Sequence, residues 1–454
     1  MSGRDDAYGC PGMQLRGGKT VMRTRDGLVS WLIVLLAGCG TNADPDRDRF
    51  EVVDSAGVQV VRNHYAGFDT TAVSLVEDLR IGVRDGDEMY QFFRAFGINV
   101  DSLGRILVAN LGTATIRVFD HDGTFVREIG AQGDGPGEFR SVTTPIVWGD
   151  TLGISDQQAM RFSVFDTSGT FLTSWPMVNT DNRALYPVGA SREGWAIWMA
   201  QYGFAQQSRR PGEVTTDTTR VGRMPSSVLA EAAMRGNAFT DSLIAGVFHW
   251  VGVPLTWASS EEGVAGFSPL FGPGRAWTVD GHGRFVLRVV AEYQVDFFGL
   301  DGRLERRVTR GFERIPVTDE MVEDYLTRVE AGLRALPPTP FDRLGSIRRH
   351  AAVSRADFLA PAGRIIVSSE GELWVDRLDI HGEVENYEYM PGYTRSLYYY
   401  DVFDADGRYR FTAKMPERFS PRWISGDTVL GILRDEDDVE YVVRYRLESQ
   451  TRSE

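Results

Sequence analysis

The side chains best suited to metal binding or acid–base catalysis are few and scattered along this sequence. Its six histidines are His64, His121, His249, His282, His350 and His381. None of them belongs to an HExxH pair or to another spacing typical of metal ligands. His121 and His282 fall inside predicted hairpin turns and His381 precedes a glycine, so we interpret these three as turn residues. The sequence therefore predicts no metal site and no cofactor.

Acidic and glycine-rich segments suggest two further kinds of chemistry. DHDG at Asp120 and DADG at Asp404 could supply calcium ligands, but an EF-hand loop requires more alternating oxygen ligands and a terminal glutamate. We interpret both as hairpin turns, and the acidic run at 435–438 as a solvated corner. GDGPGEF at 133–139 lacks the Lys-Ser/Thr continuation and the helix of a phosphate-binding loop, so we interpret it as a structural connection. The chain also lacks a GxSxG elbow, and we predict no catalytic residue.

The strongest chemical signal concerns the thiol of Cys39. Arg23 and Arg25 precede an apolar run at 28–38, which is far shorter than the ~20 residues that a membrane-spanning helix needs. The run ends in Leu-Ala-Gly directly before Cys39. This order of charge, apolar run, small residues and cysteine resembles the signal sequence of bacterial lipoproteins, in which the cysteine is lipidated and becomes the new N-terminus. A cleaved secretory signal with a chance cysteine is the alternative.

This resemblance implies a signal peptide at 1–38 and an exported chain that is lipid-anchored at the cell envelope. Residues 1–21 fit poorly as the start of a signal, so we predict that translation begins at Met22. Residues 39–49 are polar and predict a solvated tether. The residue after Cys39 is glycine rather than the aspartate associated with inner-membrane retention, which favours the outer membrane over another site on the periplasmic side.

Composition limits the partners. The chain has 454 residues, 42% hydrophobic and 25% charged, with a formal net charge of −14. An acidic body disfavours nucleic acid or anionic lipid as the main partner, so we expect membrane contact through the anchor alone. Cys10 lies upstream of the predicted cleavage point, so the mature chain cannot form an internal disulfide. We expect a monomer.

Two kinds of hairpin repeat along the chain. An apolar-Phe-Asp-x-x-Gly pattern occurs as VFDHDGTF at Val118, VFDTSGTF at Val164 and VFDADGRY at Val402. A second glycine hairpin precedes it in the same unit, as in VDSLGRILV at Val100 and VSSEGELWV at Val367. Two hairpins give four antiparallel strands for every ~45 residues, which is typical of a β-propeller blade. Consecutive apolar residues in these strands indicate that both faces of each sheet are covered.

Counting the units predicts six blades, although seven would also be compatible with the pattern. The predicted blades are at 98–130, 145–176, 186–224, 275–310, 362–415 and 421–447. Strand-like segments at 50–62 and 74–83 are left over, and we expect them to complete the ring. A closed ring leaves only short, protected sheet edges and would provide rigidity without a disulfide. The predicted fold is therefore all-β, with a single propeller domain at 50–449.

The first two blades resemble six-bladed propellers of the NHL-repeat kind. The resemblance rests on the loop at 133–139 and on INVDSLGRILVANLGTATIRVFDHDGTF at 98–125. Members of this group often have an aspartate after the second strand, and the matching positions here hold Asn110 and Asp156. The later units depart from this pattern, with Val289 and Arg377 at those positions.

Two insertions with predicted helices interrupt the blades. The first, at 205–270, contains PSSVLAEAAMRGN, in which Pro225 and Ser226 begin a short helix. The second contains VTDEMVEDYLTRVEAGL at 317–333, where Thr318 can cap the helix. Its apolar stripe consists of Val322, Tyr325, Leu326, Val329 and Leu333. A lid or a docking helix is one interpretation, but we favour a helix packed on the propeller.

Two functions are compatible with this sequence. One is a binding or scaffold module that holds an envelope protein, peptide or glycan on a propeller face, with ligand-binding residues that the sequence does not identify. The other is a metal-dependent lyase or lactonase-like hydrolase with a site in the central channel, which would need His, Asp, Glu or Asn from several blades. No such set recurs at equivalent positions, which favours binding. Six tryptophans within the blades could stack on sugars, but packing explains them more simply: Trp148, Trp175, Trp195, Trp198, Trp277 and Trp374.

Overall fold

The structure is a computed structural model, and the described part of the chain lies within one compact unit, Asp44–Glu454. The described residues are 49–64, 70, 72–177, 185–190, 195–201, 216–225, 244–251, 256–260, 263–267, 270–271, 276–289, 292–299, 301–334, 345, 348, 355–377 and 399–449. Cys39, the predicted signal peptide and nearly all of the predicted tether lie outside them.

Five four-stranded antiparallel sheets, and four antiparallel strands of a sixth, larger sheet, form the body of this unit, and we number them as blades 1 to 6. Blade 1 consists of β4 (Ala95–Val100), β5 (Ile106–Asn110), β6 (Thr115–Phe119) and β7 (Phe125–Ile129). Blade 2 consists of β8 (Ile146–Trp148), β9 (Thr151–Asp156), β10 (Arg161–Asp166) and β11 (Phe171–Pro176). Blade 3 consists of β12 (Leu185–Ala190), β13 (Trp195–Gln201), β14 (Thr216–Pro225) and β15 (Ile244–Val251).

The other three blades come from the C-terminal half, with one N-terminal strand. Blade 4 consists of β18 (Ala276–Val279), β19 (Phe285–Val289), β20 (Gln294–Phe298) and β21 (Leu304–Arg310). Blade 5 consists of β22 (Ala362–Val367), β23 (Leu373–Arg377), β24 (Tyr399–Phe403) and β25 (Tyr409–Lys414). Blade 6 consists of β26 (Phe419–Ser425), β27 (Thr428–Arg434), β28 (Glu440–Ser449) and β3 (Val73–Ile81).

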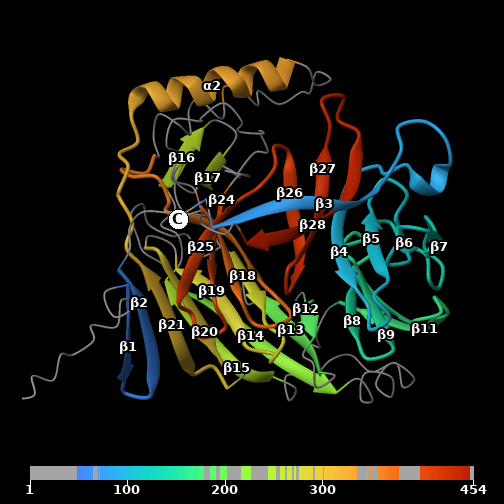
Figure 1. The fold of residues 1–454 in the computed structure, drawn as a ribbon, viewed down its shortest axis with the longest axis horizontal. Helices are drawn as coiled ribbons and strands as arrows, with labels where there is room; N and C mark the ends of the chain where they lie inside the picture. The colour runs from blue at the N-terminus through green and yellow to red at the C-terminus, as the bar shows by residue number, and fades with distance from the viewer. Residues whose placement is uncertain are drawn as a thin grey trace, which may run out of the picture. The chain divides into compact units, whose positions relative to one another are not determined.

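The first strand of each blade contacts the first strand of the next, and these contacts close a ring. They run from β4 to β8, β12, β18, β22 and β26 and back to β4. In Figure 1, the labelled inner strands β4, β8, β12, β18 and β26 lie around a common centre, with strands such as β5 to β7 farther out. The fold is therefore a six-bladed β-propeller, which confirms the predicted all-β class and the four-stranded antiparallel blades.

The ring is closed by strands from opposite ends of the chain. β3 pairs antiparallel with β28, from Val73 opposite Ser449 to Ile81 opposite Val442. Asp78 on β3 accepts hydrogen bonds from Arg444 and Arg446 on β28, at 2.7 and 2.6 Å. The expectation that the segment at 74–83 completes the ring is confirmed, because this strand supplies the fourth position of blade 6.

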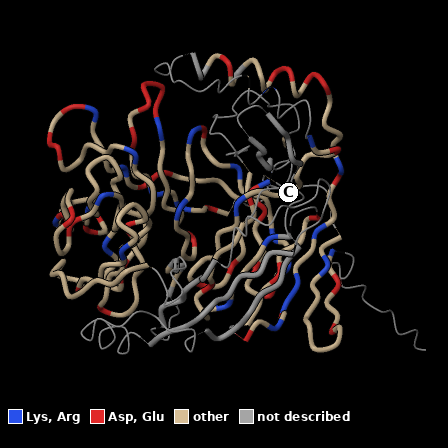
Figure 2. Tube along the Cα trace, turned by 180° about the vertical axis from the view of Figure 1, so that it is seen from behind, with Lys and Arg blue, Asp and Glu red and all other residues tan. Residues whose placement is uncertain are grey.

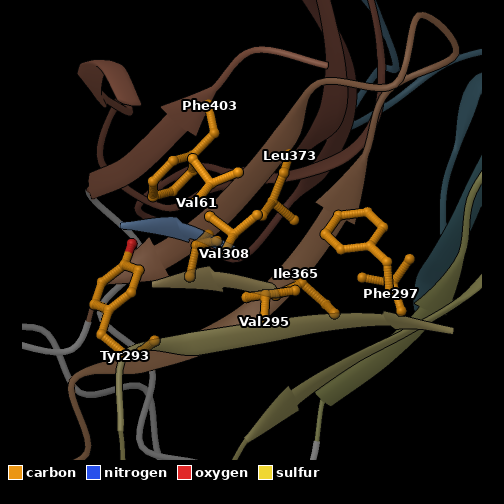
Figure 3. Close-up of a cluster of buried hydrophobic side chains, with 11 residues drawn as sticks. Val61, Tyr293, Val295, Phe297, Val308, Ile365, Leu373 and Phe403 are labelled. Atoms are coloured by element: carbon orange, nitrogen blue, oxygen red, sulfur yellow. The ribbon is translucent and has the colours of Figure 1, made fainter. Parts of the chain in front are cut away.

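The other N-terminal segment has a different place from the one expected. β1 (Phe50–Ser55) and β2 (Val58–Asn63) form a hairpin, and β2 pairs in parallel with β21 at the outer edge of blade 4. This hairpin does not complete the ring but extends one sheet to six strands. Its Val61 is fully buried in the core between blades 4 and 5, where Figure 3 shows it among Val308, Leu373 and Phe403.

The repeated Val-Phe-Asp motif has a structural explanation. Its Val-Phe pair lies at a β-bulge between the third and fourth strands in blades 1, 2 and 5: Val118/Phe119, Val164/Phe165 and Val402/Phe403. The three phenylalanines are buried between sheets. The glycine that follows ends a tight turn; Gly123, for example, has a φ of +87° and donates its N–H to the carbonyl of Asp120 at 2.9 Å. A residue with a Cβ is disfavoured at that φ, which explains the recurring glycine.

The two predicted insertions differ in outcome. Part of the first, 205–270, belongs to blade 3, because β14 and β15 are its outer strands and β15 follows the predicted end of that blade at 224. The segment also contains a hairpin of β16 (Thr256–Ser260) and β17 (Gly263–Phe267). The helix predicted after Ser226 lies outside the described residues.

The second insertion contains the helix α2 (Asp319–Arg334), where the sequence predicts one. Thr318 caps it, because its Oγ1 accepts the N–H of Met321 at 3.3 Å. The apolar side of α2 packs against connections between blades rather than against the blades themselves. This cluster consists of Val322 and Leu326 of the helix with Leu270, Phe271, Val317 and Leu359.

Charged residues of both signs are distributed over the described part of the chain. Figure 2 shows Lys and Arg interspersed with Asp and Glu along the described strands and loops. Among the described residues, no helix has the length and apolar composition needed to cross a bilayer.

Candidate functional site

The residues that the sequence singled out for metal chemistry serve as turns. His121 is exposed in the turn between β6 and β7, and His282 lies in the turn between β18 and β19. The Asp404 carboxylate accepts the N–H groups of Asp406 and Arg408 at 3.0 and 2.9 Å. Asp435 accepts those of Asp437 and Val439 in the same way. These four interpretations as turns are confirmed, whereas His381 lies outside the described residues. Within the described residues, no group of three or more His, Cys, Asp and Glu side chains is arranged to hold a metal ion.

The glycine-rich loop at 133–139 is a structural connection, as predicted. Phe139 is fully buried against Phe165 of the next blade, with ring centroids 5.9 Å apart. The N–H of Gly133 donates to the carbonyl of Phe139 at 3.0 Å, and the N–H of Gly135 donates to the Glu138 carboxylate at 2.8 Å. The loop therefore satisfies its own polar groups while it connects β7 to β8.

The polar residues that end the second strands also have structural partners. Asn110 Oδ1 accepts the N–H of Phe93 at 2.8 Å, just before the inner strand of blade 1. Asp156 Oδ2 accepts the N–H of Arg140 at 2.7 Å, in the corresponding segment before blade 2. Both side chains are fully buried. We conclude that each anchors the chain where it enters an inner strand.

The buried tryptophans are packing residues. The ring of Trp148 stacks on that of Phe162, with their centroids 6.1 Å apart. The ring centroids of Phe162 and Trp175 are 5.1 Å apart. Trp148, Trp175 and Trp374 are buried and cannot present a ring to a sugar. The side chains of Trp195 and Trp198 lie outside the described residues.

A cluster of buried charges joins blades 4 and 5. The carboxylate of Asp401 accepts hydrogen bonds from the Tyr293 hydroxyl at 2.6 Å and the Thr412 hydroxyl at 2.5 Å, and it pairs with Arg310. Burial, followed by the charge of Asp401, raises the pKa of Tyr293 well above its usual value. Burial lowers the pKa of nearby Arg288 to about 10. The Asp401 contacts connect strands of two blades, so this cluster is a structural element of the interface.

The inner strands contain irregularities of a kind found at binding sites. Four of them have β-bulges next to their second strands: β4 at Ala95/Ile98, β12 at Pro187/Gly189, β22 at Ala362/Ile365 and β26 at Pro421/Trp423. A bulge changes the direction of a side chain and is over-represented beside active sites. The bulged residues of three adjacent blades include Phe96, Arg364 and Arg422.

Phe96 on β4 is 46% exposed although its strand is the innermost of blade 1. β5 pairs with one edge of β4, and β8 and β26 contact it from the neighbouring blades. The solvent that reaches this ring therefore lies at the centre of the ring of inner strands or at its end. An exposed phenylalanine in such a place is a candidate contact for a ligand.

Two arginines extend from Phe96 across the neighbouring inner strands. The guanidinium of Arg422 on β26 lies 5.8 Å from the centroid of the Phe96 ring. Arg364 on β22 is half-buried, and its Nη1 donates to Ser420 Oγ at 3.3 Å and to the Pro421 carbonyl at 3.5 Å. We refer to Phe96, Arg364 and Arg422 as the inner-strand patch.

The chain just before β4 adds a second exposed aromatic ring, because Phe93 is 55% exposed. Arg94, which follows it, is exposed and has a left-handed φ of 56°. Arg418 has the same conformation, with a φ of 57°, one residue before β26. The carbonyls of both accept a backbone N–H at 3.2 Å, from Leu111 and Arg434 respectively. A left-handed arginine thus precedes the inner strand in both blade 1 and blade 6, and we interpret this conformation as part of the propeller architecture.

The sequence did not predict the inner-strand patch. No sequence pattern distinguishes Arg364 and Arg422 from the other arginines in strands. The direction of their side chains depends on β-bulges, which in turn depend on how the strands pair. Four apolar or aromatic residues within QFFRAFG at 91–97 were the only visible signal, because Phe93 and Phe96 interrupt the alternation of a strand with one buried face.

Comparison with known proteins supports the fold. The sequence model of a family described as "6-bladed beta-propeller" matches residues 98–228. This match covers most of blade 1, all of blade 2 and part of blade 3, where the sequence repeats are clearest. No curated protein is significantly similar in sequence to the chain.

Solved structures with similar folds have low sequence identity. A protein of Bacteroides fragilis described as exported is 13% identical, covering 86% of this chain and 99% of its own, with a TM-score of 0.46. A DUF4221 family member from Bacteroides vulgatus is 10% identical, covering 84% and 100%, with a TM-score of 0.49. Virginiamycin B lyase from Staphylococcus aureus is 11% identical, covering 83% and 100%, with a TM-score of 0.41. Likenesses this distant transfer no functional residue to this chain.

Proposed function

We propose that this chain is an exported binding protein, lipid-anchored through Cys39 at the cell envelope, whose propeller resembles the NHL-repeat kind. Its ligand binds at the inner-strand patch, and the chain holds an envelope component there. The signal sequence supports the anchor, and the acidic composition supports a partner other than nucleic acid. The tether at 39–49 would leave the propeller free to reach that partner.

One observation carries the binding function. An exposed phenylalanine and two arginines lie on the innermost strands of three successive blades, with the Arg422 guanidinium 5.8 Å from the Phe96 ring. Aromatic residues, including phenylalanine, and arginine are enriched at protein recognition sites. Their positions on strands, rather than on loops, would hold them in place before a ligand arrives.

Site-specific photocrosslinking tests this function. A benzophenone amino acid replaces Phe96 in the full chain, in the cells that make it, and a matched variant carries the same group at Leu103. Leu103 is a suitable control because it is 69% exposed and lies in the turn after β4. We expect adducts with an envelope component from position 96 alone. The same adducts from both positions, or none from position 96, would contradict the proposal.

The metal-enzyme alternative has a separate test. Stoichiometric calcium or zinc in the purified full chain would favour a lyase or lactonase-like hydrolase over a binding protein. Within the described residues, the patch offers guanidinium donors and an aromatic ring, and neither group supplies the lone-pair ligands that a metal ion needs.

A further inference from the structure

Arg364, one of the two arginines of the inner-strand patch, has hydrogen-bond donors that the described part of the chain leaves unused. Both of its hydrogen bonds use Nη1, and both acceptors are neutral, at 3.3 and 3.5 Å. These distances are longer than the usual 2.7–3.2 Å for N–H···O hydrogen bonds. Among the described residues, no Asp or Glu forms an ion pair with this side chain. Its other donors, Nε and Nη2, form no hydrogen bond with the described part of the chain.

A half-buried guanidinium with free donors is suited to an oxyanion, either a carboxylate or a phosphate. A carboxylate matches the planar fork of arginine, because its two oxygens can accept two parallel N–H groups. Such a pair is stronger when water is partly excluded, as it is on an inner strand between neighbouring blades. The geometry therefore favours an oxyanion at Arg364, and we take the carboxylate because its single charge matches that of one guanidinium.

The neighbouring groups indicate what this carboxylate is attached to. Ser420 Oγ bonds Arg364, and Arg422, two residues farther along β26, places its guanidinium 5.8 Å from the Phe96 ring. The row Arg364–Ser420–Arg422–Phe96 thus has two guanidinium groups on either side of a serine hydroxyl and ends on an aromatic ring, across three adjacent inner strands. Phe96 has only a hydrocarbon ring and no polar atom. It suits an apolar side chain next to the carboxylate.

We propose that the inner-strand patch binds the C-terminal residue of a peptide, with its carboxylate on Arg364 and its apolar side chain on Phe96. This inference rests on the proposed function and specifies its ligand. An acidic sugar fits less well, because several hydroxyl groups would need partners, and the described side chains of the patch offer one serine hydroxyl besides the arginines. A peptide C-terminus needs only a carboxylate contact and an apolar surface.

The test measures binding of three probes to the full chain, purified in detergent, by titration calorimetry. The probes are N-acetyl-phenylalanine, its amide, and glucuronate. We expect the acid to bind at least ~10-fold more tightly than the amide, since a charge-assisted hydrogen bond pair distinguishes them. Equal binding of the acid and the amide would overturn the proposal, and so would glucuronate binding as tightly as the acid or no binding of the acid at all.

Three variants assign the preference to individual residues. R364Q should remove the preference for the acid, and R364K should keep part of it, because lysine retains the charge but not the fork. F96A should weaken the acid and the amide to the same extent. R303Q is the matched control for loss of charge, since the Arg303 side chain is 86% exposed in the turn between β20 and β21. Retention of the acid preference in R364Q would overturn the proposal.

Folding and the broader function are controlled separately. Each variant should keep the urea midpoint of the natural chain; if R364Q does not, R364K and the natural chain still decide the outcome through the acid and amide probes. If crosslinks form from position 96 but the acid does not bind, the carboxylate inference fails while the proposed binding function stands. If no crosslink forms from position 96 and the acid does not bind, the carboxylate inference and the proposed binding function both fail.

Discussion

Replacing Asn63 with alanine should weaken the attachment of the N-terminal hairpin to blades 4 and 5. Asn63 ends β2 and is only 2% exposed. Its Nδ2 donates to the carbonyls of Thr309 and Gly407, both at 3.0 Å, and its Oδ1 accepts the N–H of Tyr409 at 2.8 Å. One side chain therefore connects the hairpin to the last strand of blade 4 and to the β24–β25 turn of blade 5.

The magnitude follows from these three contacts. A buried polar group that loses its hydrogen bond costs about 1–3 kcal/mol. The hydrogen bond to Gly407 is buried, so its loss falls at the upper end of that range. The other two hydrogen bonds are partly buried, so the loss of each falls at the lower end. We expect Asn63→Ala to lower the free energy of unfolding by about 3–5 kcal/mol, which is a large share of the ~5–15 kcal/mol typical of a folded domain.

Urea unfolding followed by tryptophan fluorescence measures this change. Asn99→Ala is a matched control, because Asn99 makes two partly buried hydrogen bonds, to the Pro145 carbonyl and the Val100 N–H. The control should lose only about 1–2 kcal/mol. A loss of less than ~1 kcal/mol for Asn63→Ala would refute the reasoning, because the hairpin would then contribute no buried hydrogen bonds to the interface.

Three further predictions concern the anchor, the ring and the blade interface. Cys39→Ala should abolish incorporation of a labelled lipid precursor, because the thiol is the predicted acceptor. Gly97→Ala should destabilise the fold by about 1–3 kcal/mol in urea unfolding, since an added Cβ would lie 2.5 Å from the Thr144 Cα and 2.6 Å from its Cβ. The stability of the natural chain should fall above about pH 10, because the folded-state pKa of Tyr293 is raised by burial and by Asp401. That contribution is complete below the unfolded-state pKa and is lost as the pH rises through the folded-state value, so Tyr293→Phe should flatten the alkaline decline.

Each of these has an outcome that would contradict it. Unchanged lipid labelling of Cys39→Ala would show that the anchor is elsewhere or absent. Gly97→Ala with natural stability would mean that β4 and the start of blade 2 are farther apart than the structure places them. Equal alkaline declines for Tyr293→Phe and the natural chain would show that Tyr293 does not gain protons on folding.

Much of the fold was predictable because the blade is a local unit. Two hairpins within ~45 residues determine their own strand pairing, and glycines such as Gly123 and Gly407, both with left-handed φ, mark the turns directly. The end of blade 3 was predicted less accurately, since its last strand, β15, follows β14 only after a long connection. The position of β1 and β2 was also missed, because nothing local distinguishes a strand that closes the ring from one that pairs in parallel with β21.

The sequence by itself determined the repeated blade, the turns and their glycines and the helix at Asp319–Arg334, since each depends on residues close together in the chain. Only the tertiary structure decided which strand closes the ring, where the N-terminal hairpin lies, and which side chains meet at the inner strands. Phe96, Arg364 and Arg422 belong to three blades and are up to 326 positions apart in the sequence. Their arrangement depends on how the ring closes and on β-bulges in the inner strands. The sequence pattern within a single blade predicts neither of these features.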